Sequence, residues 1–354
     1  GDHRDLHSFP TRRSSDLNNA LYILLIVAII YTYIQNSNFL SAASIVNIIS
    51  LSAANLPIAC GIAGCIVLTG TDLSAGRVVG LTACITASLM QSVTYATKMF
   101  PNLPVLPIPL VILIVLLVGG IVGWVNGFFV AKFQLHPFIV TLATQLIVYG
   151  LLLMYIMING NNGQPLSGLD QHFNDVVKGS VISFNAGGAR IAIPNYVWLA
   201  ALIVVIMWFI WNKTTFGKNL YAVGGNPEAA AVSGISVFWV TVGAFVLAGI
   251  LYGFGSWLEC LRMTGSGSAA YGQGWEMDAI AACVVGGISF TGGIQRLMVN
   301  ALTDEGPSGI DYRERGPMWR WSRPERKAKL SISINHHHTE PAQNADVGCM
   351  PGLL

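Results

Sequence analysis

Three acidic side chains set in apolar surroundings are the residues of this sequence most able to do chemistry: Asp72, Glu276 and Asp278. Asp72 lies in the run Thr69 to Arg77, where two glycines flank a short polar cluster. An ionisable group inside a membrane marks a proton or ion pathway, whereas an Asp just before a helix can cap it. We favour the cap for Asp72, because the sequence from Leu73 predicts a helix, and the pathway stays open as the alternative.

Motifs for enzyme chemistry are missing from the sequence. It contains no GxxxxGK[ST] phosphate loop, since Gly217-Lys218 is followed by Asn219, and it lacks HExxH, paired CxxC and GxSxG elements. Five of the six cysteines lie in or beside apolar runs, where a thiol acts as a small hydrophobic group. We therefore expect a chain that is not an enzyme and binds no cofactor or metal.

The composition predicts a membrane protein. Hydrophobic residues make up 53% of the 354 residues and charged residues only 10%, against about 25% charged residues in soluble proteins. The segment 18–302 holds nine basic and seven acidic residues, and the rest of the charges lie in the two tails. Outside the C-terminal tail no cluster of Lys and Arg predicts binding of nucleic acid.

Apolar runs of about 20 residues predict about eight membrane-spanning helices, because a bilayer leaves no water to satisfy an open backbone. The fold class is thus an all-α, polytopic transmembrane bundle. The runs cover 17–34, 45–68, 78–95, 108–131, 138–158, 196–211 and 237–258, with a last one starting near Asp278.

The distribution of Lys and Arg sets the orientation of these spans. With the first helix running outward, Arg77, Lys132, Lys213, Lys218 and Arg296 face the cytoplasm. The polar interval from Asn159 to Pro194 then lies outside. It is either a solvated loop or a docking surface for an extracellular partner.

The cytoplasmic interval from Asn212 to Ile235 contains a complete set of helix signals. In order, these are a breaking Gly225, a capping Asn226, a Pro227 suited to the first helical position, Glu228 at the positive end of the dipole, and the helix-forming Ala229, Ala230 and Ala231. They predict a helix of about two turns that ends before Gly234. So short a helix is marginal alone in water, so it packs either on a partner subunit or on the chain's own helix ends.

A second glycine-rich element, Asp278 to Gly293, resembles the first. Shifted by 217 positions, Gly70 falls on Gly287, Ser74 on Thr291 and Gly76 on Gly293. Transporters are often built from two related halves with interrupted helices. Packing of small residues between helices requires the same residue types, so an internal repeat and simple packing both remain open.

Three motifs together resemble one known family. They are TGTDLSAGR at 69–77, FGKNLYAVGGNPEAAAVSGI at 216–235 and DAIAACVVGGISFTGG at 278–293. In this order they resemble the permease subunits of bacterial ABC importers for monosaccharides, above all the galactose/methyl-galactoside permeases, which are relatives of the ribose permeases. The similarity runs from about Tyr22 to Gly293.

The resemblance implies a multi-pass protein of the bacterial inner membrane that works with other subunits. These would be a second permease copy, an ABC ATPase subunit and a periplasmic sugar-binding protein. The residues Gly225, Asn226, Pro227, Glu228, Ala229 and Ala230 would couple the chain to the ATPase. The translocation path would pass near Thr69, Thr71, Asp72, Ser74, Gly286, Gly287, Ser289 and Thr291.

The ends of the chain depart from the family. Residues 1–17 do not have the pattern of a signal peptide, and we interpret them as a non-native extension of the permease domain at 18–302. The segment 303–354 carries fourteen charges where family members continue with further apolar spans. It is either a disordered cytoplasmic tail or the product of a frameshift, which we favour; in that case the family's last spans are missing.

Two other functional classes are compatible with the pattern. A secondary transporter driven by an ion gradient would use Asp72, Glu276 or Asp278 as its proton or cation site. A non-transporting membrane scaffold is the third possibility.

Overall fold

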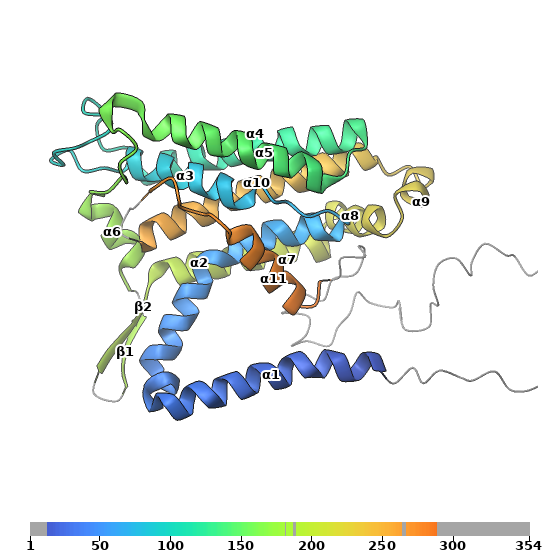
Figure 1. Cartoon of the computed structure of the whole chain (residues 1–354), viewed down its shortest axis with the longest axis horizontal. Helices are drawn as coiled ribbons and strands as arrows, with labels where there is room; N and C mark the ends of the chain where they lie inside the picture. Colours follow the sequence, from blue (N-terminus) through green and yellow to red (C-terminus); the bar gives the residue numbers. More distant parts are fainter. Residues whose placement is uncertain (1–12, 181, 187–188, 264–266, 289–354) are drawn as a thin grey trace, which may run out of the picture. The chain divides into compact units, whose positions relative to one another are not determined.

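The computed structural model describes residues 13–180, 182–186, 189–263 and 267–288, and shows a helical bundle with one small hairpin (Figure 1). The elements, in chain order, are α1 (Arg13–Gln35), η1 (Ser37–Leu40), α2 (Ala42–Val67), α3 (Ala75–Leu89), α4 (Ile108–Phe133), α5 (Pro137–Ile156), η2 (Ile158–Gly160), α6 (Gln171–Lys178), β1 (Ile182–Ala186), β2 (Ala189–Ile193), α7 (Asn195–Lys213), α8 (Thr215–Gly225), α9 (Pro227–Val232), α10 (Val237–Arg262) and α11 (Trp275–Val285).

Each of the eight predicted spans coincides with a helix, which confirms a polytopic helical membrane protein. Among the described residues, five helices are long and apolar enough to cross a bilayer: α2, α4, α5, α7 and α10. The other three differ from the prediction in length. The described apolar part of α1 begins at Ile23, α3 has 15 residues and α11 has 11. At ~1.5 Å per residue, 15 residues rise only about 22 Å, less than the ~30 Å of a hydrocarbon core.

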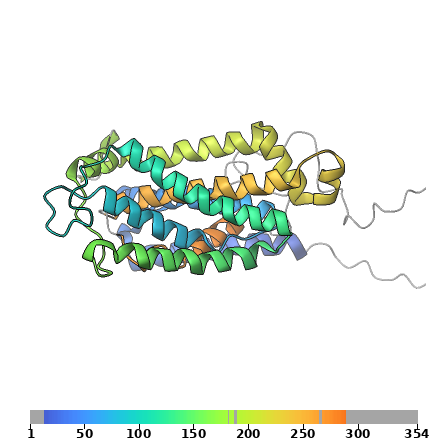
Figure 2. The same cartoon turned by 90° about the horizontal axis from the view of Figure 1, so that it is seen from above.

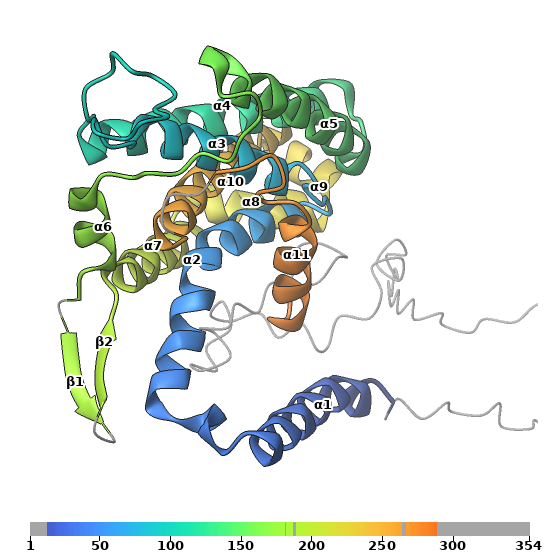
Figure 3. The ribbon, with the colours of Figure 1, turned by 60° about the vertical axis from the view of Figure 1, so that its left-hand side comes forward.

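The helix α10 is the centre of the bundle and packs against α2, α3 and α4 (Figure 3). Its contact with α4 is built on small residues. A Cβ added to Gly119 would overlap the carbonyl oxygen of Gly249, and one added to Gly123 would overlap the carbonyl oxygen of Phe245. Glycines four residues apart let two backbones approach closely, which is how helices associate in a membrane.

The outward-facing side chains of the bundle are apolar, as a bilayer requires. The helix α4 packs on α10, α5 packs on α3 and α4, and α7 packs on α2; Figure 2 shows the bundle from above. The exposed residues of α4, α5 and α7 include Leu117, Ile121, Leu146, Ile147, Leu202 and Val205. In a soluble protein, so continuous an apolar surface would mark an interface. Here lipid tails are the partner of this surface.

The interval between α5 and α7 carries ordered structure that the sequence interpretation left as a loop. It contains η2, α6 and an antiparallel hairpin whose register pairs Ile182 with Ile193 and Ala186 with Ala189. The helix α6 is capped by the Asp170 side chain, whose Oδ1 accepts the His172 N–H at 3.0 Å, and it buries Phe173 in the bundle.

Candidate functional site: a break in the middle of the membrane

The polar run between α2 and α3 is a sharp break between two buried helices. Thr69 has a left-handed backbone with φ 61°, which ends α2. Gly70 then passes close to the start of α5, since a Cβ there would lie 2.7 Å from the Pro137 ring. The Thr141 hydroxyl of α5 accepts the Leu73 N–H at 3.1 Å and donates to the Thr71 carbonyl at 3.3 Å. These contacts hold the break against α5.

Asp72 connects the break to two further helices. Its Oδ1 accepts hydrogen bonds from the Ser74 N–H at 2.9 Å and from the Ser74 hydroxyl at 2.6 Å. Its Oδ2 accepts one from the Tyr252 hydroxyl of α10 at 3.2 Å. The Ser74 hydroxyl in turn accepts from the Asn126 amide of α4 at 2.9 Å. Asp72 is 1% exposed and Ser74 is fully buried, so one carboxylate joins the α2–α3 break to α4 and α10.

This geometry corrects one detail of the sequence interpretation. The helix was expected to begin at Leu73, directly after Asp72, but α3 begins at Ala75 and its N-cap position is Ser74. Asp72 accepts the N–H two residues ahead of it, as Asp and Asn do in turns. It therefore stabilises the turn that leads into α3 rather than the first helical turn itself.

The break lies near the middle of the bundle in depth. The centre of the 26-residue α10 falls at about Gly249, which faces Gly119 of α4. Asn126, which holds Ser74, stands beside Gly127, and Gly127 packs on Val242. Since Asp72 is held from the other side by Tyr252, the break lies between the levels of Val242 and Tyr252. Transporter sites formed by interrupted helices lie at this depth.

A second interruption lies beside the first. After α10 the described chain resumes at Gly267, whose backbone pairs with Leu166 through hydrogen bonds of 2.7 and 3.0 Å. The segment 267–274 then runs along α3 without helical structure: Gly267 packs on Cys84, and Gly272 packs on Gly76. Gly272 and Gly274 have φ of 74° and 82°, a conformation that favours glycine. The chain then enters α11 at the level of the α3 start.

Charged groups surround this second break. The Arg77 side chain donates to the Ala269 carbonyl at 3.2 Å and lies over the Tyr149 ring, 4.1 Å from its centroid. Glu276, in the first turn of α11, is 5% exposed. Its Oε1 accepts from the Gln145 amide at 3.4 Å, and its Oε2 lies against Gly76 with no hydrogen-bond donor among the described residues.

Gly286 and Gly287, the two glycines predicted for the path, lie at the C-terminal end of α11. They follow the last turn of α11, where their N–H groups donate to the carbonyls of Ala282 and Val284, and Gly287 has φ 92°. The predicted path residues Ser289 and Thr291 lie outside the described residues. Thr69 is exposed, and its hydroxyl donates to the Leu68 carbonyl.

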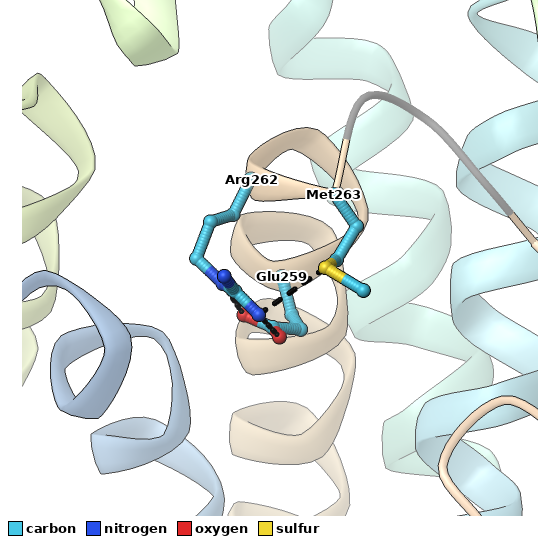
Figure 4. A network of polar contacts seen from close by, with 3 residues as sticks. All are labelled: Glu259, Arg262 and Met263. Atoms are coloured by element: carbon cyan, nitrogen blue, oxygen red, sulfur yellow. Dashed lines mark hydrogen bonds and ion pairs between the residues drawn. The ribbon is translucent and has the colours of Figure 1, made fainter. Parts of the chain in front are cut away.

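The C-terminal end of α10 carries an ion pair that the sequence reasoning missed. The Arg262 guanidinium donates hydrogen bonds to both carboxylate oxygens of Glu259, with a distance of 2.6 Å from Nε to Oε2 (Figure 4). It also contacts the Met263 sulfur at 3.3 Å. It is the one ion pair among the described residues. Glu259 is 2% exposed. The signal in the sequence was the i, i+3 spacing of opposite charges at the end of a span.

The short helix predicted between Asn212 and Ile235 is present as α9, with the bounds Pro227–Val232. The Asn226 side chain caps it by accepting the Ala229 N–H at 2.9 Å, and Gly234 follows with φ 84°. A further helix, α8, precedes it and ends at Gly225; its cap is Thr214, which accepts the Gly217 N–H at 3.3 Å. The sequence interpretation had left α8 as a loop.

The faces of α9 differ. Ala230 is 4% exposed and packs into the core of the bundle. Glu228 and Val232 lie one turn apart on the opposite side, since successive residues turn by about 100° in an α-helix. Glu228 is exposed, and Val232 is 91% exposed. A fully exposed Val at the tip of a helix is an apolar group without a partner in the described part of the chain.

In the described ranges, no three His, Cys, Asp or Glu side chains come together as a metal site would require. The five cysteines described are free and buried.

Comparison with known proteins places these features in a family. Residues 37–302 match the family described as "Branched-chain amino acid transport system / permease component". The chain is 45% identical to the galactose/methyl galactoside import permease protein MglC of Salmonella typhimurium over 275 residues, 77% of this chain and 79% of that protein. With MglC of Haemophilus influenzae the identity is 42% over 285 residues, 80% of this chain and 82% of the relative.

A more distant relative is the ribose import permease protein RbsC of Haemophilus influenzae, 33% identical over 277 residues, which cover 78% of this chain and 79% of that protein. No solved structure matches the chain. The family match spans the bundle from η1 to beyond α11, including both breaks and α9. The chain therefore belongs to this family of membrane permease components.

Proposed function

We propose that the chain is the permease subunit of an ATP-driven importer in the bacterial inner membrane, and that it carries galactose, methyl galactoside or a similar monosaccharide. The observation that carries the proposal is the identity to galactose/methyl galactoside import permeases, 45% and 42%, against 33% to a ribose permease. Two interrupted helices near mid-membrane support it, because such breaks form the binding region of transporters.

The same relatives support two partners of the proposed importer, an ATPase and a sugar-binding protein, and we add a second permease copy to the proposal. An ABC ATPase would dock on the cytoplasmic side, a periplasmic sugar-binding protein on the outer side, and a second permease copy would complete the path. ATP binding and hydrolysis would shift the permease between inward-facing and outward-facing states, to the extent that the ATPase binds the two states differently.

The helix α9 is the proposed contact with the ATPase. Ala230 anchors it to the bundle, while Glu228 and Val232 point away from the bundle. A rigid helix with one buried face can transmit a displacement of its outer face directly to the spans on either side. The remaining coupling residues, Gly225 to Ala229, shape and cap this helix.

The proposed path passes the α2–α3 break, formed by Thr69, Thr71, Asp72 and Ser74, and continues toward Gly286, Gly287, Ser289 and Thr291. Within the break, Asp72 serves as an internal acceptor, since both of its oxygens already receive donors of the chain. That arrangement speaks against Asp72 as the ion site of a secondary transporter.

Uptake into proteoliposomes tests the energy source. The chain is reconstituted with the cognate ATPase, the sugar-binding protein is added outside, ATP is enclosed, and uptake of labelled galactose is followed. We expect uptake that requires ATP and persists when a protonophore and ionophores collapse the ion gradients. Uptake that continues without ATP and stops with the gradients would replace the proposal with the secondary transporter.

Co-purification tests the contact at α9. We expect Val232→Asp to reduce the amount of ATPase that purifies with the chain, because a charge is placed on the apolar tip. Val176→Asp is the matched control, since Val176 is an exposed Val on the outer helix α6. Equal ATPase recovery with both variants would remove α9 as the docking element.

A further inference from the structure

The second break, between α10 and α11, has one side packed on protein and one side open. Gly267, Tyr271 and Gly272 are buried against α3, whereas Ala270 and Gln273 are exposed. Backbone without helical structure is tolerated at membrane depth only where protein covers it or where it lines a water-filled cavity. The open side of this segment therefore faces water or another protein rather than lipid.

The first turn of α11 adds a charged residue, Asp278, to the exposed side of this segment. Ala279 and Cys283 share the buried face of α11, and Asp278 lies on the opposite, exposed face beside Met277. Its level is close to that of Glu276, which packs on Gly76 next to the α2–α3 break. A carboxylate near the bilayer centre is strongly unfavourable in contact with lipid, and such residues face cavities or pathways.

The side chains at this place match the chemistry of a sugar. Gln273 offers an amide with two donors and one acceptor, and Asp278 offers acceptors, which suit neighbouring hydroxyl groups. Trp275 is half-buried, with Tyr271 tilted against it at a ring separation of 4.9 Å, and an aromatic face stacks on the C–H face of a pyranose. Pockets for small polar ligands combine these elements: apolar walls with a few placed polar groups.

We propose that Gln273, Trp275 and Asp278 form a contact site for the monosaccharide on its way through the membrane, at the break between α10 and α11. The site rests on the proposed function, since it takes the cargo of the importer as its ligand. It lies beside the Thr69–Ser74 break, so the two interruptions border the same level of the path. The Glu276 Oε2 is buried at the edge of this site and receives no hydrogen bond from the described residues. A sugar hydroxyl or a water molecule can donate a hydrogen bond to it.

Thiol accessibility tests whether the site faces water. Asp278→Cys and Gln273→Cys are introduced one at a time into the chain assembled with its partners, and treated with a charged, membrane-impermeant methanethiosulfonate. We expect modification of both, slowed by galactose during turnover. The parent chain gives the background, because its five described cysteines are buried. Ile147→Cys is the matched control, since Ile147 is 63% exposed on the apolar face of α5, and we expect it to resist the charged reagent.

Two results would overturn the inference at this stage. Lack of modification at both positions would mean that they do not face water. Disulfide-linked dimers of Asp278→Cys without modification would mean that the second copy covers this face instead of the sugar path.

Transport kinetics test the contact itself. We expect Asp278→Asn and Gln273→Ala to lower the sugar transported per ATP hydrolysed by at least fivefold, while ATPase recovery in co-purification stays normal and reports folding. Unchanged coupling in both variants would overturn the site, provided that the parent chain shows ATP-dependent galactose uptake. Failure of the parent chain to take up galactose with ATP would instead count against the proposed function.

Discussion

The substitution Asp72→Ala tests whether this carboxylate is a structural connection or a transport group. Three donors of the chain bond to Asp72: the Ser74 N–H, the Ser74 hydroxyl and the Tyr252 hydroxyl. After truncation the Ser74 hydroxyl can turn to the Asn126 Oδ1, which is buried and accepts no hydrogen bond in the described structure. The Ser74 N–H and the Tyr252 hydroxyl remain as two buried donors without acceptors.

The magnitude follows from these two orphaned donors. A buried donor left unsatisfied costs about 1–3 kcal/mol, so Asp72→Ala should lower the free energy of unfolding by about 2–6 kcal/mol. In Asp72→Asn the remaining Oδ1 keeps both Ser74 bonds, and the Tyr252 hydroxyl can rotate to accept from the new amide. The free energy of unfolding of Asp72→Asn should therefore fall by less than about 1.5 kcal/mol, which is the contribution of one ordinary hydrogen bond.

Thermal unfolding of the purified chain in detergent measures the difference. At about 2–4 °C per kcal/mol, Asp72→Ala should lower Tm by at least about 4 °C, and Asp72→Asn by clearly less. Tyr252→Phe should couple to Asp72→Ala in a double-mutant cycle, because both changes break the same bond. An Asp72→Ala chain with the parent Tm but no uptake would refute the structural reasoning and restore Asp72 as a pathway group.

Three further predictions concern other parts of the bundle. Gly123→Ala should lower Tm by several degrees, because its Cβ would overlap the Phe245 carbonyl of α10. Gly150→Ala is the control and should leave Tm unchanged, because the space at its Cβ is open. Equal Tm values for the two variants would mean that α4 and α10 do not pack through glycine. Arg262→Ala should lower the free energy of unfolding by about 3–5 kcal/mol, because it leaves the buried Glu259 unpaired. The double variant with Glu259→Gln should regain part of the lost Tm in thermal unfolding. A double variant with no higher Tm than Arg262→Ala would contradict the ion pair. Asn226→Ala should lower the stability of α9 by about 0.5–2 kcal/mol, because the helix loses its N-cap. The measurement is the amount of ATPase that co-purifies with the chain, which we expect to fall. Unchanged ATPase recovery would show that the cap is dispensable.

Local signals in the sequence were sufficient where a short stretch determines its own structure. The helix α9 has the predicted bounds because Asn226, Pro227 and Gly234 act within one or two turns. The long spans were predictable for a similar reason, since apolar length alone decides whether a helix can cross a bilayer. The hairpin β1–β2 had a signal that went unused: Gly187-Gly188 between alternating residues is typical of a tight turn.

The polar connections were not predictable, because their partners are distant in the sequence. Tyr252 lies 180 positions from Asp72, and Arg77 lies 192 positions from Ala269. Neither Tyr252 nor Asn126 stands out in an apolar helix, where buried Tyr and Asn are common packing residues. The late start of α3 has the same origin: Thr141 and Tyr252 hold residues 71–74 in a turn that local propensity would have made helical.

The position of α10 joins the two ends of the proposed mechanism. Its first residue, Val237, follows α9 after only the turn Ser233–Ser236, and its middle holds Asp72 through Tyr252. Its C-terminal end, which carries the Glu259–Arg262 pair, precedes the segment that packs along α3 and enters α11. Close-packed interiors transmit strain, and α10 packs closely on α4 through glycines. A displacement of α9 would therefore reach both mid-membrane breaks through one element, and the short, tightly hydrogen-bonded break at Asp72 would move together with the open one at Asp278.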